Sequence, residues 1–176
     1  MVISWYISSI IQDFKGPVRY MIPALFFSGC IVLTVSYLRR RKYTIRHIIA
    51  LTFFIAYLLV IFYTVFLCRE PGSRQEISLV PFETWGCSFR MHAMFIENII
   101  MFIPFGIFLP LLFRKFKNGY LCVLTGFICS CSIEVIQHIT QTGYLQVDDV
   151  MTNTAGTLIG WMVWKAGKSI IRHFGY

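Results

Sequence analysis

The fold follows first from residues 94–113, which read MFIENIIMFIPFGIFLPLLF. An α-helix rises about 1.5 Å per residue, so about 20 apolar residues are enough to cross the hydrocarbon core of a bilayer. Only Glu97 and Asn98 interrupt the apolar character of this stretch. We therefore predict a transmembrane helix over residues 94–113, with two polar side chains close to its start.

The rest of the chain repeats this pattern. Four further apolar stretches have a similar length: residues 20–38, 48–68, 119–139 and 150–169. Over all 176 residues, 57% are hydrophobic and 14% are charged, whereas a soluble domain carries about a quarter charged residues. This composition excludes a disordered chain, a nucleic-acid-binding domain with an ordinary polar surface and a small disulfide-stapled scaffold. The sequence therefore predicts an all-α, polytopic transmembrane helical bundle of about five spans.

The N-terminal segment differs from these spans. Residues 1–18 begin with an apolar run that is too short to cross a membrane. We predict that this segment lies in the membrane interface, with Trp5 and Tyr6 at the depth of the headgroups. Residues 19–176 then form a single transmembrane domain.

The distribution of basic residues predicts how the bundle is oriented. Residues 39–46, 114–118 and 165–172 follow or end the first, third and fifth spans, and they contain lysines and arginines but no acidic residue. All eight acidic residues lie in the segments on the opposite side of the membrane or in the spans near that side. Because loops rich in lysine and arginine stay on the cytoplasmic side, we expect the N-terminus outside and the C-terminus inside.

Polar residues inside three of the spans are the candidates for a binding site. An ionisable side chain at mid-helix costs roughly 2.5–3.5 kcal/mol on insertion scales, so such a side chain calls for an explanation. The third and fifth spans enter from outside and the fourth leaves to the outside, which places their polar residues at a similar depth in the outer leaflet. The ligand-binding candidates are Glu97, Asn98, Glu134, Gln137, His138, Asp148, Asp149 and Asn153.

A purely structural role for these residues is the alternative. Asp148 or Asp149 could cap the fifth helix, where the helix dipole favours negative charge. His138 could be an ordinary satisfied polar residue, and Glu97 could sit among the headgroups. Glu134 is harder to account for in this way, because a buried carboxyl group must be protonated or find a partner. We therefore favour a functional site over a polar network that only holds helices together.

Two further features bear on how the helices are arranged. Gly156 and Gly160 form a GxxxG pair in the fifth span, and Gly126 with Ser130 forms a second pair of small residues in the fourth. Such pairs allow close helix packing in membranes. Residues 79–83, which read LVPFE, form an apolar patch in an external loop. This loop could rest on the headgroups or fold back against the bundle.

Four short motifs resemble those of VanZ-like membrane proteins. Residues 97–106 (ENIIMFIPFG) resemble the family segment N-x-x-x-F-x-P-x-G, and residues 132–137 (SIEVIQ) resemble its S-x-E-x-x-Q. Residues 147–156 (VDDVMTNTAG) resemble its D-D-x-x-x-N-x-x-G, and residues 79–82 (LVPF) match a fourth, shorter motif. All four occur in order within residues 78–164. The resemblance assigns the family's polar positions to Asn98, Glu134, Gln137, Asp148, Asp149 and Asn153.

The chain departs from the family pattern in two places. Ser78 stands where the family often has Asn, and Tyr144 and Gln146 lie where it commonly has an Arg and a further Asp. An anionic group held by those residues in relatives would not find them in this chain.

The resemblance implies an integral, multi-pass protein of the bacterial cell membrane, in a family whose namesake is associated with teicoplanin resistance. From the residues, our leading hypothesis is that the polar cluster engages a membrane lipid, a cell-wall precursor or a lipoglycopeptide at the outer leaflet. The alternative is an intramembrane enzyme, dependent on a metal or on carboxylates, that acts on a lipid-linked substrate. A transporter and an assembly partner are further alternatives. The sequence identifies no metal-binding motif, cofactor or catalytic residue, and we expect no nucleic-acid partner.

Overall fold

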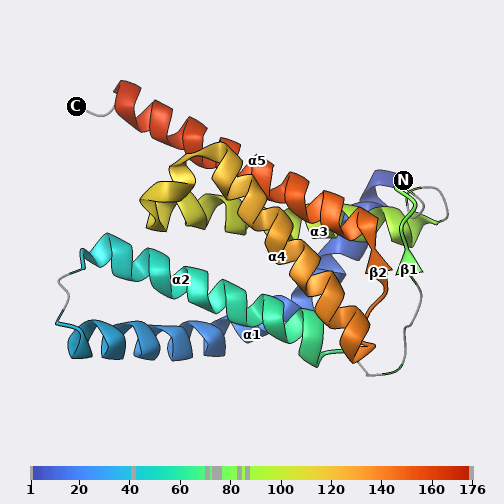
Figure 1. Ribbon diagram of the computed structural model, residues 1–176, viewed down its shortest axis with the longest axis horizontal. Coiled ribbons are helices and arrows are strands. Elements are labelled where there is room, and N and C mark those ends of the chain that lie inside the picture. Colours follow the sequence, from blue (N-terminus) through green and yellow to red (C-terminus); the bar gives the residue numbers. More distant parts are fainter. Residues whose placement is uncertain are drawn as a thin grey trace. The chain divides into compact units, whose positions relative to one another are not determined.

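The computed structural model in Figure 1 describes residues 2–40, 43–69, 72, 77–82, 85 and 88–174, with the backbone alone for residues 2–5 and 174. Most of these residues are helical. The predicted all-α helical bundle is therefore confirmed. The chain divides into two compact units, Met1–Arg69 and Glu70–Tyr176.

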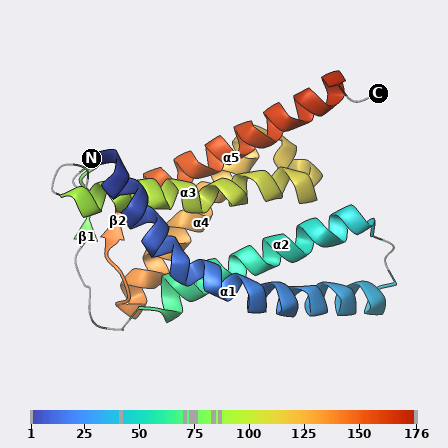
Figure 2. The same cartoon turned by 180° about the vertical axis from the view of Figure 1, so that it is seen from behind.

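The first unit is a pair of helices. α1 (Val2–Leu38) and α2 (Ile45–Phe62) lie side by side in both Figure 1 and Figure 2, and the π-helix η1 (Tyr63–Leu67) continues α2. Small and β-branched side chains let two helices approach closely, because little volume separates their backbones. The buried residues at this contact are Ala24, Ala56 and Val60.

The predicted interfacial segment and the predicted first span belong to one helix. α1 is continuous from Val2 to Leu38 and contains Pro17 and Pro23. Figure 2 shows that α1 bends along its length, as expected where proline removes a backbone hydrogen bond. The position of residues 1–18 in the membrane interface stays a prediction, and the side chain of Trp5 lies outside the described residues.

The described residues of the second unit form three α-helices, α3, α4 and α5. α3 and α5 begin at the end of the unit that carries the short strands, whereas α4 runs in the opposite direction and ends there (Figure 1). A short 3₁₀ helix, η3 (Arg114–Lys117), joins α3 to α4. The bounds are Phe89–Leu112 for α3, Gly119–Thr140 for α4 and Val147–Phe174 for α5.

Side-chain caps fix the ends of these helices. The hydroxyl group of Ser88 accepts a hydrogen bond from the backbone N–H of Met91 at the start of α3. The side-chain oxygen of Asn118 accepts one from the N–H of Tyr120, at 2.9 Å, at the start of α4. Such caps satisfy N–H groups that have no partner within the helix. α4 then ends at Gln141, whose φ of 56° is left-handed.

α3 and α5 pack backbone against backbone. A Cβ atom at Gly156 would clash with the carbonyl oxygen of Ile99, and one at Gly160 would clash with the carbonyl oxygen of Ile103. Gly106 on α3 faces the backbone of α5 in the same way. Only glycine allows this approach, because any side chain would have to occupy the space of the facing helix. The close packing predicted from the GxxxG pair is therefore confirmed.

Four helices among the described residues are long and apolar enough to cross a membrane. They correspond to four of the five predicted spans: Tyr6–Leu38, Ile45–Leu67, Phe89–Leu112 and Gly119–Thr140. α5 has 28 residues, which is also long enough, but it is less apolar. Its polar residues Thr152, Asn153 and Thr157 are buried, so they do not need to face lipid. The fifth crossing and the orientation stay predictions.

One feature lies outside the all-helical expectation. Strand β1 (Ile77–Ser78) pairs in parallel with strand β2 (Leu145–Gln146). Ile77 is opposite Leu145 in this pairing, and Ser78 is opposite Gln146. The pairing fastens the segment before α3 to the residues that lead into α5.

The contact between α3 and α5 predicts a difference between two matched variants. Gly160→Ala should destabilise the second unit by about 1–3 kcal/mol, because overpacking forces the backbones apart. In Gly167→Ala, no atom lies within 4 Å of the added Cβ, so the same substitution should be tolerated. Both changes bring the same gain in helix propensity, and unfolding of the full chain in detergent, followed by circular dichroism, compares them. Equal stability of the two variants would contradict the contact.

Candidate functional site

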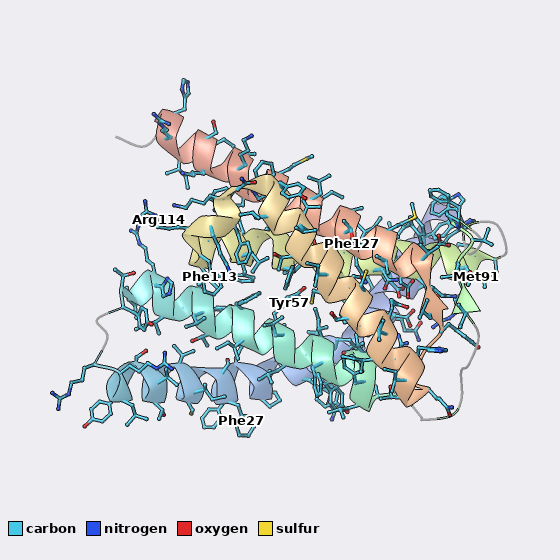
Figure 3. All side chains as sticks on the ribbon, in the orientation of Figure 1. Phe27, Tyr57, Met91, Phe113, Arg114 and Phe127 are labelled. Atoms are coloured by element: carbon cyan, nitrogen blue, oxygen red, sulfur yellow. The ribbon has the colours of Figure 1, made fainter. Side chains whose placement is uncertain are left out.

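The predicted site residues lie at one end of the second unit. This is the end where α3 and α5 begin and α4 ends. In Figure 3, Met91 marks this end and Arg114 marks the opposite end. The directions of the three helices therefore bring their polar residues to one level, as the sequence predicts. Four hydrogen bonds connect these side chains to neighbouring helices, to strand β2 and to the loop of residues 79–82.

The first hydrogen bond joins α3 to α5. The side chain of Asn98 donates from Nδ2 to Oδ1 of Asp149, and the two atoms are 2.7 Å apart. Both side chains are half-buried. A hydrogen bond to a charged acceptor is stronger than one between neutral groups. Asp149 is thus more than a residue of the first helical turn, because its carboxylate binds a neighbouring helix.

The second hydrogen bond joins α4 to α5. Nδ2 of Asn153 donates to the hydroxyl oxygen of Ser130 at 2.9 Å, and both side chains are buried. The other polar atom of this amide, Oδ1 of Asn153, is buried and has no hydrogen-bond partner among the described residues. An unpaired buried acceptor costs about 1–3 kcal/mol. This oxygen is therefore an acceptor whose hydrogen-bonding capacity is not used within the described residues.

The third hydrogen bond involves Glu134, the carboxyl group that the sequence places farthest into a span. Oε2 of Glu134 accepts the backbone N–H of Gln146 at 3.0 Å. Glu134 is 3% exposed, so its carboxyl group is removed from solvent and this donor compensates part of the desolvation cost. The bond ties the last turns of α4 to strand β2.

The fourth hydrogen bond holds the loop of residues 79–82. Oδ1 of Asp148 accepts the backbone N–H of Phe82 at 2.6 Å. The loop therefore folds back to the site through its backbone. Its side chains face outward, because Leu79, Val80 and Phe82 are 66%, 60% and 56% exposed. The result is an apolar surface patch, residues 79–82, attached directly to a buried carboxylate.

Three other predicted residues lie around this network. Gln137 is buried one turn after Glu134, and its backbone carbonyl group accepts a hydrogen bond from the N–H of Thr142. Glu97 and His138 are half-buried. Nδ1 of His138 has no hydrogen-bond partner within the described part of the chain. The participation of the eight residues in ligand binding stays a prediction.

Sequence reasoning missed the hydroxyl groups of the site. The sequence pattern indicates Ser130 only as a small packing residue, yet it provides the acceptor for Asn153. It lies one turn before Glu134 and thus on the same helix face, which is the signal that could have identified it. Thr152 and Thr157 are also buried, and their hydroxyl groups donate back to carbonyl oxygens of α5.

The chemistry of the network is that of amides, hydroxyl groups and carboxylates. Where the structure describes side chains, no three of His, Cys, Asp and Glu lie close enough together to hold one metal ion. Carboxylates and amide oxygens accept hydrogen bonds from hydroxyl, amide and ammonium groups. The carboxyl oxygens of Glu134, Asp148 and Asp149 are acceptors that join the elements of this network.

Two serines on α4 provide a matched test of the network. Ser130→Ala should destabilise the chain by roughly 0.5–2 kcal/mol, because it leaves the buried amide of Asn153 without its acceptor. Ser132→Ala removes an exposed hydroxyl group that bonds only within its own helix, to Ile128, and should change stability little. Unfolding of the two variants in detergent measures the difference. Identical losses would mean that the contact between α4 and α5 contributes nothing.

Comparison with known proteins places the chain in a family. The VanZ/LLP1 family matches residues 53–171, which include α3, α4 and α5 up to Ile171. Protein VanZ of Enterococcus faecium is 36% identical over 89 residues, which are 49% of this chain and 51% of that protein. The chain thus spans about half the length of this curated relative. No solved structure matches the sequence of this chain. With its apolar helices, the chain is a membrane protein of the VanZ type, and it belongs to the VanZ/LLP1 family.

Proposed function

We propose that this protein binds an amphiphile at the outer leaflet of the bacterial cell membrane through the polar network of α3, α4 and α5. The ligand would be a membrane lipid, a cell-wall precursor or a lipoglycopeptide. Its polar group would enter the network and its apolar part would lie against residues 79–82. The proposal is one of binding, and it names no reaction.

The hydrogen bond between Asp148 and Phe82 is the observation that carries this proposal. It holds an exposed apolar patch against a buried polar network. A ligand that is polar along its whole length would gain nothing from the patch, and a purely apolar one would leave the buried polar groups unpaired. An amphiphile satisfies both surfaces at once.

The available polar atoms favour a ligand that donates hydrogen bonds. Oδ1 of Asn153 is a buried acceptor without a partner among the described residues. Carboxylate oxygens such as those of Asp149 are strong acceptors for hydroxyl, amide and ammonium donors. Sugar hydroxyl groups, peptide N–H groups and ammonium groups supply such donors. Cell-wall precursors and lipoglycopeptides carry them next to long apolar chains.

The place of action follows from the predicted topology. Five crossings with the N-terminus outside put the polar network in the outer leaflet, where lipid-linked precursors and externally added glycopeptides meet the cell. We further propose that this protein contributes to teicoplanin resistance, because the namesake of the family it resembles is associated with that resistance. Binding at this site would be the physical basis of that contribution.

Photocrosslinking tests the proposal. The full chain in phospholipid vesicles would be exposed to a benzophenone derivative of teicoplanin and to a diazirine derivative of a polyprenyl-linked disaccharide pentapeptide. Asp149→Asn should lower the labelling by one of these probes about tenfold, because it removes the charge that strengthens hydrogen bonds to the ligand. An oxygen acceptor for Asn98 is retained in this variant, so the helix contact is preserved.

Asp13→Asn is the matched control, since it makes the same chemical change in α1, outside the second unit. Labelling by both probes that is unchanged in a folded Asp149→Asn variant would contradict the site. Resistance is a separate readout. A susceptible bacterium expressing the chain should grow at higher teicoplanin concentrations than one expressing Asp149→Asn, and equal growth would argue against a role of the site in resistance.

A further inference from the structure

A groove lies at the opposite end of the second unit from the polar network. It has a volume of about 470 Å³, within the range of about 300–1,000 Å³ typical of ligand pockets. Residues from the C-terminal halves of α3 and α5 line it. Its apolar lining includes Ile107, Pro110, Leu111, Val163 and Trp164.

Two lysines stand on this groove. Lys117 belongs to η3 and Lys168 to α5, and both line the groove and are exposed. Nζ of Lys168 lies over the ring of Trp164, 5.6 Å from its centroid. The backbone of Lys117 is fixed to α5, because its carbonyl oxygen accepts a hydrogen bond from Nε1 of Trp161 at 3.4 Å. Both cationic groups are thus carried by elements that form the groove wall.

The charged side chains in the segments around the groove are all positive. Residues 113–118 and 154–176 contain six lysines and arginines and no acidic residue. The acidic residues of α3, α4 and α5 lie at the other end of these helices. An anion that approaches this end therefore meets no opposing carboxylate from these segments, and the field there favours negative charge.

We propose that this groove binds an anionic phospholipid of the surrounding membrane. One acyl chain would lie in the apolar groove between α3 and α5, and the phosphate would be held between Lys117 and Lys168. Basic pockets between transmembrane helices are suited to anionic headgroups. The site is distinct from the polar network and does not depend on the function proposed for it.

The combination of surfaces selects a lipid over a free anion. Inorganic phosphate would use the two lysines but would leave the apolar lining uncovered. A neutral lipid would use the lining but not the charges. Lysines near an anionic headgroup attract it, so the two together should favour an anionic lipid over a neutral one by at least about tenfold.

Native mass spectrometry of the full chain tests this site. The purified protein would be titrated in detergent with phosphatidylglycerol and, separately, with phosphatidylcholine of identical acyl chains. The wild type should bind one phosphatidylglycerol with at least tenfold higher affinity. The double variant Lys117→Gln/Lys168→Gln should lose this preference. Lys115→Gln/Lys165→Gln removes the same charge from the same end but from residues outside the groove lining, and should keep it.

A second variant tests the groove itself. No atom lies within 4 Å of a Cβ added at Gly167, which lines the groove, so Gly167→Leu should fold normally and fill the space of the acyl chain. It should weaken phosphatidylglycerol binding about tenfold. Gly16→Leu is its control, because Gly16 also has no atom within 4 Å of an added Cβ and lies in α1.

The outcomes separate the possible explanations. Equal losses in the two lysine double variants would show a diffuse charge effect and overturn the site. Unchanged binding in Gly167→Leu would show that no acyl chain occupies the groove. Binding of inorganic phosphate without binding of phosphatidylglycerol would show that the lysines hold a free anion and not a lipid.

Discussion

The second unit depends on one constraint: a polar side chain that is shielded from water must find its partner within the protein. α3, α4 and α5 meet this constraint with each other. Asn98 binds Asp149 across one helix pair, and Asn153 binds Ser130 across another. Glycines allow α3 and α5 to touch along their backbones, which brings Asn98 within reach of Asp149. Packing and polar pairing therefore support each other at the same end of the unit.

The same network connects the helices to the loops. Glu134 and Asp148 use their carboxylates to hold backbone N–H groups of the segments outside the helices. A structural role and a binding role are compatible in such a site, since a carboxylate can accept several hydrogen bonds at once. Rigid positioning of the polar atoms would also lower the ordering cost of binding a ligand. The second unit thus carries two chemically different ends, one acidic and amide-rich and the other basic with an apolar groove.

The sequence predicts much of this arrangement. Apolar runs of about 20 residues locate α2, α3 and α4 within a few residues, because the thickness of a bilayer sets the length of a helix. Helix direction then predicts that Asn98, Asp149 and Asn153 meet at one end. The VanZ-like resemblance, carried by short motifs, agrees with the family found over residues 53–171.

Other features depend on contacts between residues far apart in the chain, which the sequence pattern does not reveal. The pairing of β1 with β2 joins two-residue strands far apart in sequence, too short to give a periodic signal. The hydrogen bond from Phe82 uses a backbone group, which every residue except proline has, so no residue type indicates it. Ser130 reads equally well as a small packing residue or as a polar partner. α1 also continues through Pro17 and Pro23, although proline within a helix usually kinks or ends it.

The hydrogen bond between Asn98 and Asp149 tests this account most directly, because it requires α3 and α5 to meet at the polar end. Solid-state NMR of the full chain in lipid bilayers, with ¹⁵N in asparagine and ¹³C in aspartate, measures the dipolar coupling between the side-chain nitrogen of Asn98 and the carboxyl carbon of Asp149. The account predicts a coupling of hydrogen-bond range that disappears in Asn98→Leu. A chain that is fully helical in the bilayer but shows no such coupling would contradict it.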